Sequence, residues 1–259
     1  MGHLHHAAYG WLTPALSYVM ACIGAALGLR CTVRALAATG TTRRNWLLTA
    51  ASAIGTGIWT MHFVAMLGFE VTGTDIHYDV PLTILSLLVA VLVVGAGVFA
   101  VGYGRGRGRA LVLGGLTTGL GVASMHYLGM AALRLHGTVS YRPLTVGLSV
   151  AIAVVAATAA LWAALHIKSP LAVAVASLVM GAAVSSMHYT GMLAVAVRVT
   201  PSDAALPGAT AMQFIFPLAV GLGSYLFLTS AFVALSPTAD ERAASTSARD
   251  LGQSAVGAR

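Results

Sequence analysis

Long apolar runs separated by short polar segments dominate this 259-residue chain. Seven of these runs hold about 20 or more residues with very few charges. A helix of about 20 apolar residues crosses the hydrocarbon core of a membrane, so each run is long enough to span it once. The pattern therefore predicts an all-α fold, a polytopic membrane bundle of seven transmembrane helices. The predicted spans are 11–29, 46–69, 81–103, 110–133, 144–167, 171–197 and 212–235.

Composition supports this prediction and excludes several classes of protein. Hydrophobic residues make up 58% of the chain and charged residues 8%, whereas soluble domains carry about 25% charged residues. So little charge cannot cover a water-facing surface, which excludes a soluble globular enzyme and a disordered or fibrous protein. We expect residues 1–235 to form one membrane-embedded domain. Residues 236–259, rich in Ala, Ser and Thr, are expected to form a disordered cytoplasmic tail.

Basic residues indicate the orientation of the bundle. Eleven of the 14 lysines and arginines fall in alternate loops and in the tail, and three fall on the other side. The positive-inside rule then predicts an N-terminus outside the cell and a C-terminus in the cytoplasm. A net charge of +7 would suggest nucleic acid in a soluble protein. Basic residues between apolar runs meet lipid head groups instead, so the lipid bilayer, and not nucleic acid, is the expected partner. The eleven are Arg30, Arg34, Arg43, Arg44, Arg105, Arg107, Arg109, Lys168, Arg242, Arg249 and Arg259, and the three are Arg134, Arg142 and Arg198.

Three segments of the chain, 55–66, 119–130 and 181–192, align without gaps. They share a glycine, four further residues, a small hydroxyl residue, Met-His-aromatic, one residue, a small residue and a final Met. The motif histidines are 64 and 62 residues apart, which is the length of two spans with their loops. The sequence thus predicts three two-helix repeats followed by one unpaired helix. The leading glycines are expected to let neighbouring helices approach closely. They are Gly55, Gly119 and Gly181.

The three motif histidines fall on alternate helices that all run outward. They share one depth near the outer face, seven to ten residues before the predicted helix ends. An ionisable residue inside a membrane is costly and usually faces the bundle interior. In each copy a methionine follows four residues later on the same helical face. Neutral imidazole suits copper, zinc and iron, and thioether sulfur selects copper, whereas the lack of carboxylates at this depth argues against calcium and magnesium. The predicted metal ligands are His62, His126, His188, Met66, Met130 and Met192.

Further residues near the motifs are candidates for an accessory role. The methionine before each histidine lies about 100° round the helix and can reach the edge of the site. Tyrosines that follow two of the histidines can orient ligands through hydrogen bonds. A histidine cluster near the N-terminus can supply or complete a metal site. No residue is predicted to be catalytic. The accessory candidates are Met61, Met125, Met187, Tyr127, Tyr189, His5 and His6.

Four-residue motifs around the histidines identify the family that the chain resembles. The third copy reads Met187-His188-Tyr189-Thr190, the second Met125-His126-Tyr127-Leu128 and the first Met61-His62-Phe63-Val64. With these motifs, over roughly residues 5–235, the chain resembles the bacterial MHYT domain family. The resemblance implies an integral sensor of the bacterial plasma membrane that binds copper near the outer face and senses oxygen, carbon monoxide or nitric oxide.

The resemblance also bears on the output of the signal. Many members of the family carry cytoplasmic domains that make or hydrolyse cyclic di-GMP, or a kinase. The sequence shows no such domain. It therefore implies a sensory module, not an enzyme, that passes its signal to a separate cytoplasmic protein. Phe63 and Val64 depart from the family motif in the first copy, and Leu128 departs from it in the second.

The sequence leaves three other interpretations open. Histidines inside a membrane also form hydrogen bonds between helices, which would make the histidine layer structural. They can relay protons or pass metal ions in a transporter, although a conducting path should show polar residues at several depths. Copper, or haem held by paired histidines, would make the protein a membrane oxidoreductase. Copper is the favoured cofactor and haem the less favoured one.

Overall fold

The computed structural model describes residues 4–5, 10–104, 106–167 and 169–236. Within these ranges seven helices are long and apolar enough to cross a membrane, which confirms the predicted all-α polytopic fold. Apart from Ser236, the expected tail lies outside the described residues. The helices are α1 (Leu12–Leu36), α2 (Gly40–Met66), α3 (Val80–Tyr103), α4 (Arg107–Ala131), α5 (Pro143–His166), α6 (Pro170–Leu193) and α7 (Phe216–Leu235), and a π-helical turn, η1 (Ala211–Ile215), leads into α7.

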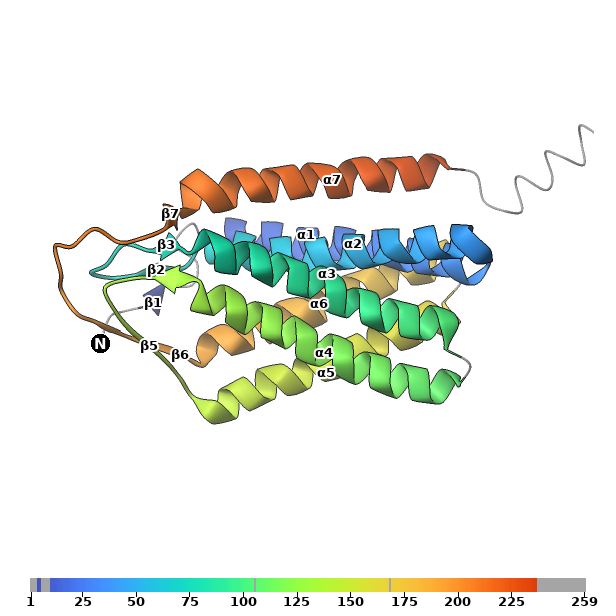
Figure 1. Cartoon of the computed structure of the whole chain (residues 1–259), viewed down its shortest axis with the longest axis horizontal. Coiled ribbons are helices and arrows are strands. Elements are labelled where there is room, and N and C mark those ends of the chain that lie inside the picture. The colour runs from blue at the N-terminus through green and yellow to red at the C-terminus, as the bar shows by residue number, and fades with distance from the viewer. Residues whose placement is uncertain (1–3, 6–9, 105, 168, 237–259) are drawn as a thin grey trace, which may run out of the picture.

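Six of the helices close a ring in chain order. Each helix from α1 to α5 packs against the next one, and α6 returns to pack against α1. The seventh helix, α7, lies outside this ring against α1 and α2 (Figure 1). The ring therefore consists of three helix pairs, α1–α2, α3–α4 and α5–α6, as the three two-helix repeats predict.

The first glycine of each motif brings one helix pair into close contact with the next. A methyl group on Gly55 of α2 would lie 2.7 Å from the nearest backbone atom of α3. One on Gly119 of α4 would clash with the backbone of Val154 in α5. One on Gly181 of α6 would lie 2.5 Å from Sγ of Cys22 in α1. The three glycines thus occupy equivalent places at three helix contacts, which confirms the packing role predicted for them.

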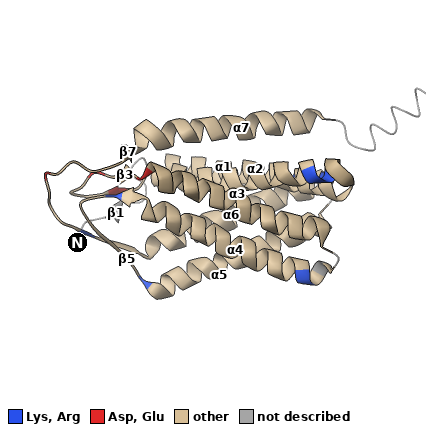
Figure 2. Ribbon diagram, in the orientation of Figure 1, with Lys and Arg blue, Asp and Glu red and all other residues tan. Residues whose placement is uncertain are grey.

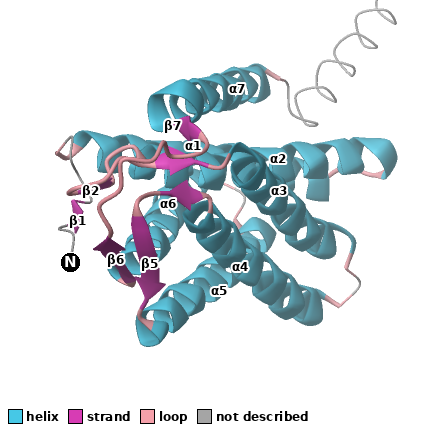
Figure 3. Cartoon of the chain, turned by 60° about the vertical axis from the view of Figure 1, so that its left-hand side comes forward, coloured by secondary structure: helices cyan, strands magenta, loops and turns pink. Residues whose placement is uncertain are grey.

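Short strands join the helices at one end of the ring, here called the strand end (Figure 3). They form three small sheets, in which β1 pairs with β2, β3 lies between β4 and β7, and β5 pairs with β6, all antiparallel. The sequence analysis does not predict them. The β-branched residues that alternate through 195–199 are the signal for the longest pair. The strands are β1 (Leu4–His5), β2 (Glu70–Val71), β3 (His77–Tyr78), β4 (Leu133–Arg134), β5 (Gly137–Tyr141), β6 (Val195–Val199) and β7 (Ala209–Thr210).

The opposite end, where α1, α3 and α5 finish and α2, α4 and α6 begin, is called the arginine end. Figure 2 shows basic residues at this end and the acidic residues at the strand end. The sequence predicts Arg30 and Arg34 in a loop, but this is wrong, because α1 continues through both of them. Arg34 is held there, since its guanidinium donates to the carbonyls of Val233 and Ser236 at 2.9 Å and lies over the ring of Trp46. The positive-inside rule still predicts that the arginine end faces the cytoplasm.

Asp79 at the strand end makes the stability of the fold depend on pH. Its carboxylate accepts the backbone N–H of Leu82 at 3.0 Å, which caps α3, and pairs with Arg134 at 2.7 Å. These contacts, the backbone hydrogen bond first, hold the pKa of the Asp79 carboxyl below its ordinary value of 3.8. A lowered carboxyl pKa stabilises the folded state at neutral pH, and this contribution is lost as the pH falls through the ordinary value and then the lowered one.

We expect the Asp79→Asn variant to unfold at a lower temperature than the wild type near neutral pH. The difference should shrink as acid protonates the wild-type carboxyl, because both proteins then carry a neutral group at this position. Thermal unfolding of the two detergent-solubilised proteins over a series of pH values measures this. A difference that is the same at every pH would contradict a role for the charge of Asp79.

A candidate metal centre

His62, His126 and His188 lie on α2, α4 and α6, the second helix of each pair. His62 stands four residues before the last residue of α2, and the other two stand five residues before the ends of α4 and α6. At 1.5 Å per residue they lie about 6–8 Å from the helix ends. The predicted depth of seven to ten residues is wrong, because apolar segments such as Val195–Val199 form strands instead of further helical turns.

The three imidazoles converge in the interior of the ring. Nδ1 of His62 lies 2.9 Å from Nδ1 of His188 and 3.2 Å from Nδ1 of His126. Each histidine offers one nitrogen that lies within 4.8 Å of the others. All three side chains are at most 1% exposed. The structure therefore brings together the three histidines that the repeat places on three separate helices.

The short distances between these nitrogens suit a bound cation. A hydrogen bond between two imidazoles needs one N–H and one bare lone pair. His62 Nδ1 has two Nδ1 neighbours but holds either one proton or one lone pair, so it cannot serve both contacts fully. A cation removes this conflict, because three bare lone pairs can point at it. Bonds of about 2.0–2.1 Å in tetrahedral geometry place the nitrogens about 3.3 Å apart, close to the two observed distances.

The outer edges of two imidazoles are closed by the next motif helix. Nε2 of His62 faces Gly129 of α4, and Nε2 of His126 faces Gly191 of α6, so a methyl group on either glycine would clash with a ring. Neither Nε2 has a hydrogen-bond partner among the described residues. Close packing therefore holds these two rings in place. Both glycines stand three positions after a motif histidine, where the first copy has Ala65; the alignment contains them but does not reveal that they touch a histidine.

The methionines predicted as ligands lie one helical turn beyond the histidines, toward the strand end. Met66, Met130 and Met192 are each 2% exposed, so their thioethers lie inside the ring and not on its surface. Met66 also lines a pocket of about 350 Å³ at the strand end, together with Glu70 and Asp75. Met66 thus borders a pocket at the strand end, and the ligand role of the three methionines stays a prediction.

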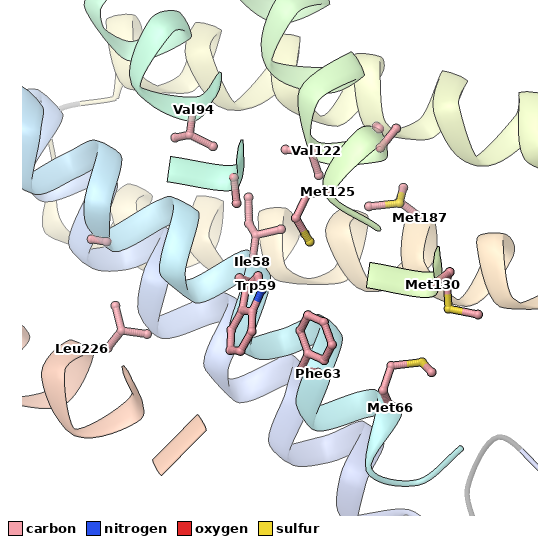
Figure 4. Packing of buried hydrophobic residues seen from close by; sticks show 14 of the residues in the cluster. Ile58, Trp59, Phe63, Met66, Val94, Val122, Met125, Met130, Met187 and Leu226 are labelled. Atoms are coloured by element: carbon pink, nitrogen blue, oxygen red, sulfur yellow. The ribbon is translucent and has the colours of Figure 1, made fainter. Parts of the chain in front are cut away.

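The methionines that directly precede the histidines are buried as well. Met61 and Met125 are fully buried and Met187 is 1% exposed. Figure 4 shows Met125 and Met187 among the apolar side chains of the interior. Met187 in addition lines a cavity on the arginine-end side of the histidines. These three residues are therefore neighbours of the cluster in the core.

An aromatic residue follows each histidine and packs edge-on against its imidazole, with ring centroids 4.6–4.9 Å apart. The hydroxyl of Tyr127 forms a 2.6 Å hydrogen bond with Ser149 of α5. The hydroxyl of Tyr189 is buried beside Ser17 of α1. Phe63 has no hydroxyl. These aromatic rings thus fix the imidazoles by packing, while the tyrosine hydroxyls are directed to the neighbouring helices.

A tryptophan makes the corresponding contact in the first copy. Trp59 lies one turn before Phe63, and their ring centroids are 4.4 Å apart. Its indole N–H donates to the hydroxyl of Ser86 in α3 at 2.9 Å, so α2 is tied to α3 much as Tyr127 ties α4 to α5. Sequence reasoning missed Trp59, because the aligned positions in the other copies hold alanine and serine.

The N-terminal histidines are only partly placed. His5 lies in β1, where it is paired with Glu70 of β2. This pairing puts its backbone at the strand end, a few residues from the end of α2. His6 lies outside the described residues. An accessory role for these two histidines stays a prediction.

Known protein sequences share this repeat. The family MHYT, described as a bacterial signalling protein N terminal repeat, matches residues 55–115 and 119–177. The third motif copy, residues 187–190, follows these two ranges and carries the literal Met-His-Tyr-Thr sequence. No solved structure is significantly similar to the chain.

Three relatives have names that concern signalling. The chain is 42% identical over 194 residues to the bifunctional diguanylate cyclase/cyclic di-GMP phosphodiesterase MucR of Pseudomonas aeruginosa. This alignment covers 72% of this chain and 28% of MucR. It is 38% identical over 162 residues to the cyclic di-GMP phosphodiesterase NbdA of the same organism, covering 60% and 21% of the two chains. It is 29% identical over 254 residues to the signaling protein YkoW of Bacillus subtilis, covering 92% and 30%. The matched regions thus span less than a third of each relative.

The fold, the repeated motif and these relatives define a multi-pass plasma membrane protein that acts as a sensory module in signalling. Its repeats are helix pairs that each contribute one histidine to a buried cluster. The chain belongs to the MHYT family.

Proposed function

We propose that this chain is a copper-binding sensor of a diatomic gas, with the strand end facing outward. The three motif histidines supply nitrogen ligands, and the methionines four residues later assist from the next helical turn. Oxygen, carbon monoxide or nitric oxide at an open position would change how these side chains are arranged. The observation that supports the proposal most is the convergence of three buried Nδ1 atoms from three different helices.

The chemistry of the donor atoms favours copper over a hard cation. Imidazole nitrogen and thioether sulfur are borderline and soft ligands, and thioether sulfur in particular selects copper. Calcium and magnesium prefer oxygen ligands, whereas the group of potential ligands described at this point consists of three histidines. Burial of the cluster also keeps competing water away from the site.

In this proposal a cation approaches the cluster through the pocket at the strand end, whose lining reaches Met66. Its lining includes Met66 and the acidic residues Glu70 and Asp75, whose negative charge attracts a cation. Met66 lies one helical turn from His62, on the same face of α2. A copper ion that enters here would pass from carboxylate oxygen to thioether sulfur and then to imidazole nitrogen.

The interior on the other side of the cluster supports sensing over the alternatives. From the histidines toward the arginine end, a cavity of about 60 Å³ is lined almost wholly by apolar side chains. A path for ions or protons needs polar groups at several depths, so this lining disfavours a transporter. The same volume is far smaller than a haem, which disfavours a haem oxidoreductase.

The output of the sensor is proposed to lie at the arginine end. There the last turn of α7 is held by hydrogen bonds from Arg34 of α1. A shift of α1 against α2 would therefore move the end of α7. MucR and NbdA are named for cyclic di-GMP enzyme activities. For this chain we propose a sensory and not a catalytic role, with a separate cytoplasmic signalling protein as the partner that responds.

Metal content and gas binding of the purified protein test this function. Cells are grown with added copper, and the detergent-purified protein is analysed by elemental mass spectrometry, with about one copper ion per chain expected for a single three-histidine site. Carbon monoxide is then added to the reduced protein, and its infrared stretching band is expected to move away from the position of the dissolved gas. Protein that binds neither copper nor gas under these conditions would overturn the proposal.

A further inference from the structure

A cavity lies inside the ring directly beside the histidine cluster, on the arginine-end side. Its volume is about 60 Å³, and all three repeats line it at matching positions. The residue four positions before each motif histidine lines it, and so does the residue eight positions before. The first set is Ile58, Val122 and Val184, and the second is Ile54, Thr118 and Met180. The cavity therefore belongs to the repeated design of the ring and is not a packing defect in one helix.

The lining offers an occupant very little polarity. Two hydroxyl residues are among the lining side chains, and both direct their hydroxyls at backbone carbonyls. Thr32 donates to the carbonyl of Gly28 at 2.8 Å, and Thr118 donates to that of Val93 at 3.4 Å. A buried water needs two to four polar partners, whereas apolar cavities stay dry. The cavity is thus suited to an apolar occupant.

The volume limits the size of that occupant. An engineered apolar cavity of about 150 Å³ binds benzene or xenon, and one water needs only about 10–15 Å³. A volume of about 60 Å³ lies between these two values. It therefore has room for a xenon atom or a diatomic molecule.

The cavity lies between the histidine cluster and the arginine end. Met187 lines the cavity and directly precedes His188, so the apolar space comes within one residue of the cluster along α6. Methionine is unbranched and changes conformation readily, which lets a small molecule pass. At the other end Ala164 lines both this cavity and a larger one of about 590 Å³, which reaches Arg43 at the arginine end.

We propose that this cavity is a binding site for one small apolar molecule of the size of dioxygen or xenon, which reaches the histidine cluster from the arginine end. Binding in the cavity depends on the apolar lining and needs no metal. Only the later encounter with the cluster rests on the proposed function. Cations and apolar molecules then approach the histidines from opposite ends of the ring, the former past Glu70 and the latter past Ala164.

Xenon is a direct probe of this site. The 259-residue chain is placed in lipid nanodiscs, and hyperpolarised ¹²⁹Xe NMR detects xenon that exchanges with a protein cavity. Ala157 lines the cavity, so the Ala157→Leu variant should fill it and lose the xenon signal. Ala159 lies on the same helix but is exposed to the outside of the ring, so Ala159→Leu is the matched control and should keep the signal.

A second variant separates this inference from the proposed function. A protein in which all three motif histidines are alanine should hold no copper and should still show the xenon signal, because the lining remains. Loss of copper with xenon retained is the expected result. A wild-type protein without a xenon signal would overturn the cavity proposal, and so would an Ala157→Leu variant that unfolds like the wild type and binds xenon equally well. Neither outcome would bear on copper binding.

Discussion

Purified His126→Ala protein is expected to contain only traces of copper where the wild type contains about one ion per chain, since the variant leaves two of three imidazole ligands. His126 is fully buried, and its Nδ1 lies 3.2 Å from Nδ1 of His62. Truncation also leaves a gap beside Gly191, into which the His126 ring fits closely. The remaining histidines are then free to form one ordinary hydrogen bond, which removes the geometry that favours a cation. Elemental mass spectrometry of the two proteins, purified side by side, measures the loss.

A histidine outside the cluster provides the matched control. His136 lies at the strand end between β4 and β5 and is partly exposed. The His136→Ala variant should keep the copper content of the wild type, because this side chain is not part of the cluster. If His126→Ala retained its copper, or if both variants lost it equally, the three-histidine site would be refuted. Thermal unfolding of each variant shows whether a loss of copper reflects the site or the whole fold.

Replacing Gly119 by valine is expected to destabilise the ring strongly. A Cβ at this position would clash with backbone atoms of Val154 and lie 2.9 Å from the carbonyl oxygen of Ala153. Backbone atoms of a packed helix cannot move aside as the end of a flexible side chain can, so α4 and α5 would be forced apart. Overpacking of this kind costs about 1–3 kcal/mol and sometimes more. The same substitution at Gly221 of α7, where no atom lies within 4 Å of the added carbon, is the control.

The free cysteines of the chain make this destabilisation measurable. Cys31 is completely buried in α1 and carries a free thiol. A thiol-reactive fluorescent dye therefore reports the temperature at which the ring opens. Both variants change a helical glycine to the same β-branched residue, so they differ mainly in the contact with α5. We therefore expect Gly119→Val to unfold at a clearly lower temperature than Gly221→Val. Equal unfolding temperatures would show that the contact between α4 and α5 contributes little.

Hydropathy predicts the helices, and motif spacing identifies the three equivalent histidines as candidate site residues. Both depend on local sequence alone. Among the described residues, the apolar runs predict all seven helices that are long and apolar enough to cross a membrane. They misplace helix ends where a residue has an unforeseen partner, as Arg34 has in the carbonyls at the end of α7. They also misplace the depth of the histidines, since the apolar residues after α6 pair with β5 instead of extending the helix.

The convergence of the imidazoles could not be predicted from the sequence. A repeat of 64 and 62 residues shows that the histidines are equivalent, but not that the ring closes with α6 against α1. That closure depends on contacts between distant residues, such as Gly181 with Cys22. The alignment marks Gly181 as small and says nothing of its partner. In the same way, the alignment marks Gly129 as small and does not show that it packs against His62.

The number of membrane crossings has a consequence of its own. The six-helix ring begins and finishes at the strand end, so a chain with the ring alone would emerge on the same face as the histidine cluster. The seventh helix supplies none of these histidines, yet it returns the chain to the opposite face. The odd number of crossings thus places the end of α7 on the face opposite the one nearest the histidine cluster. Gain of another helix pair would preserve this parity, whereas loss of α7 would reverse it.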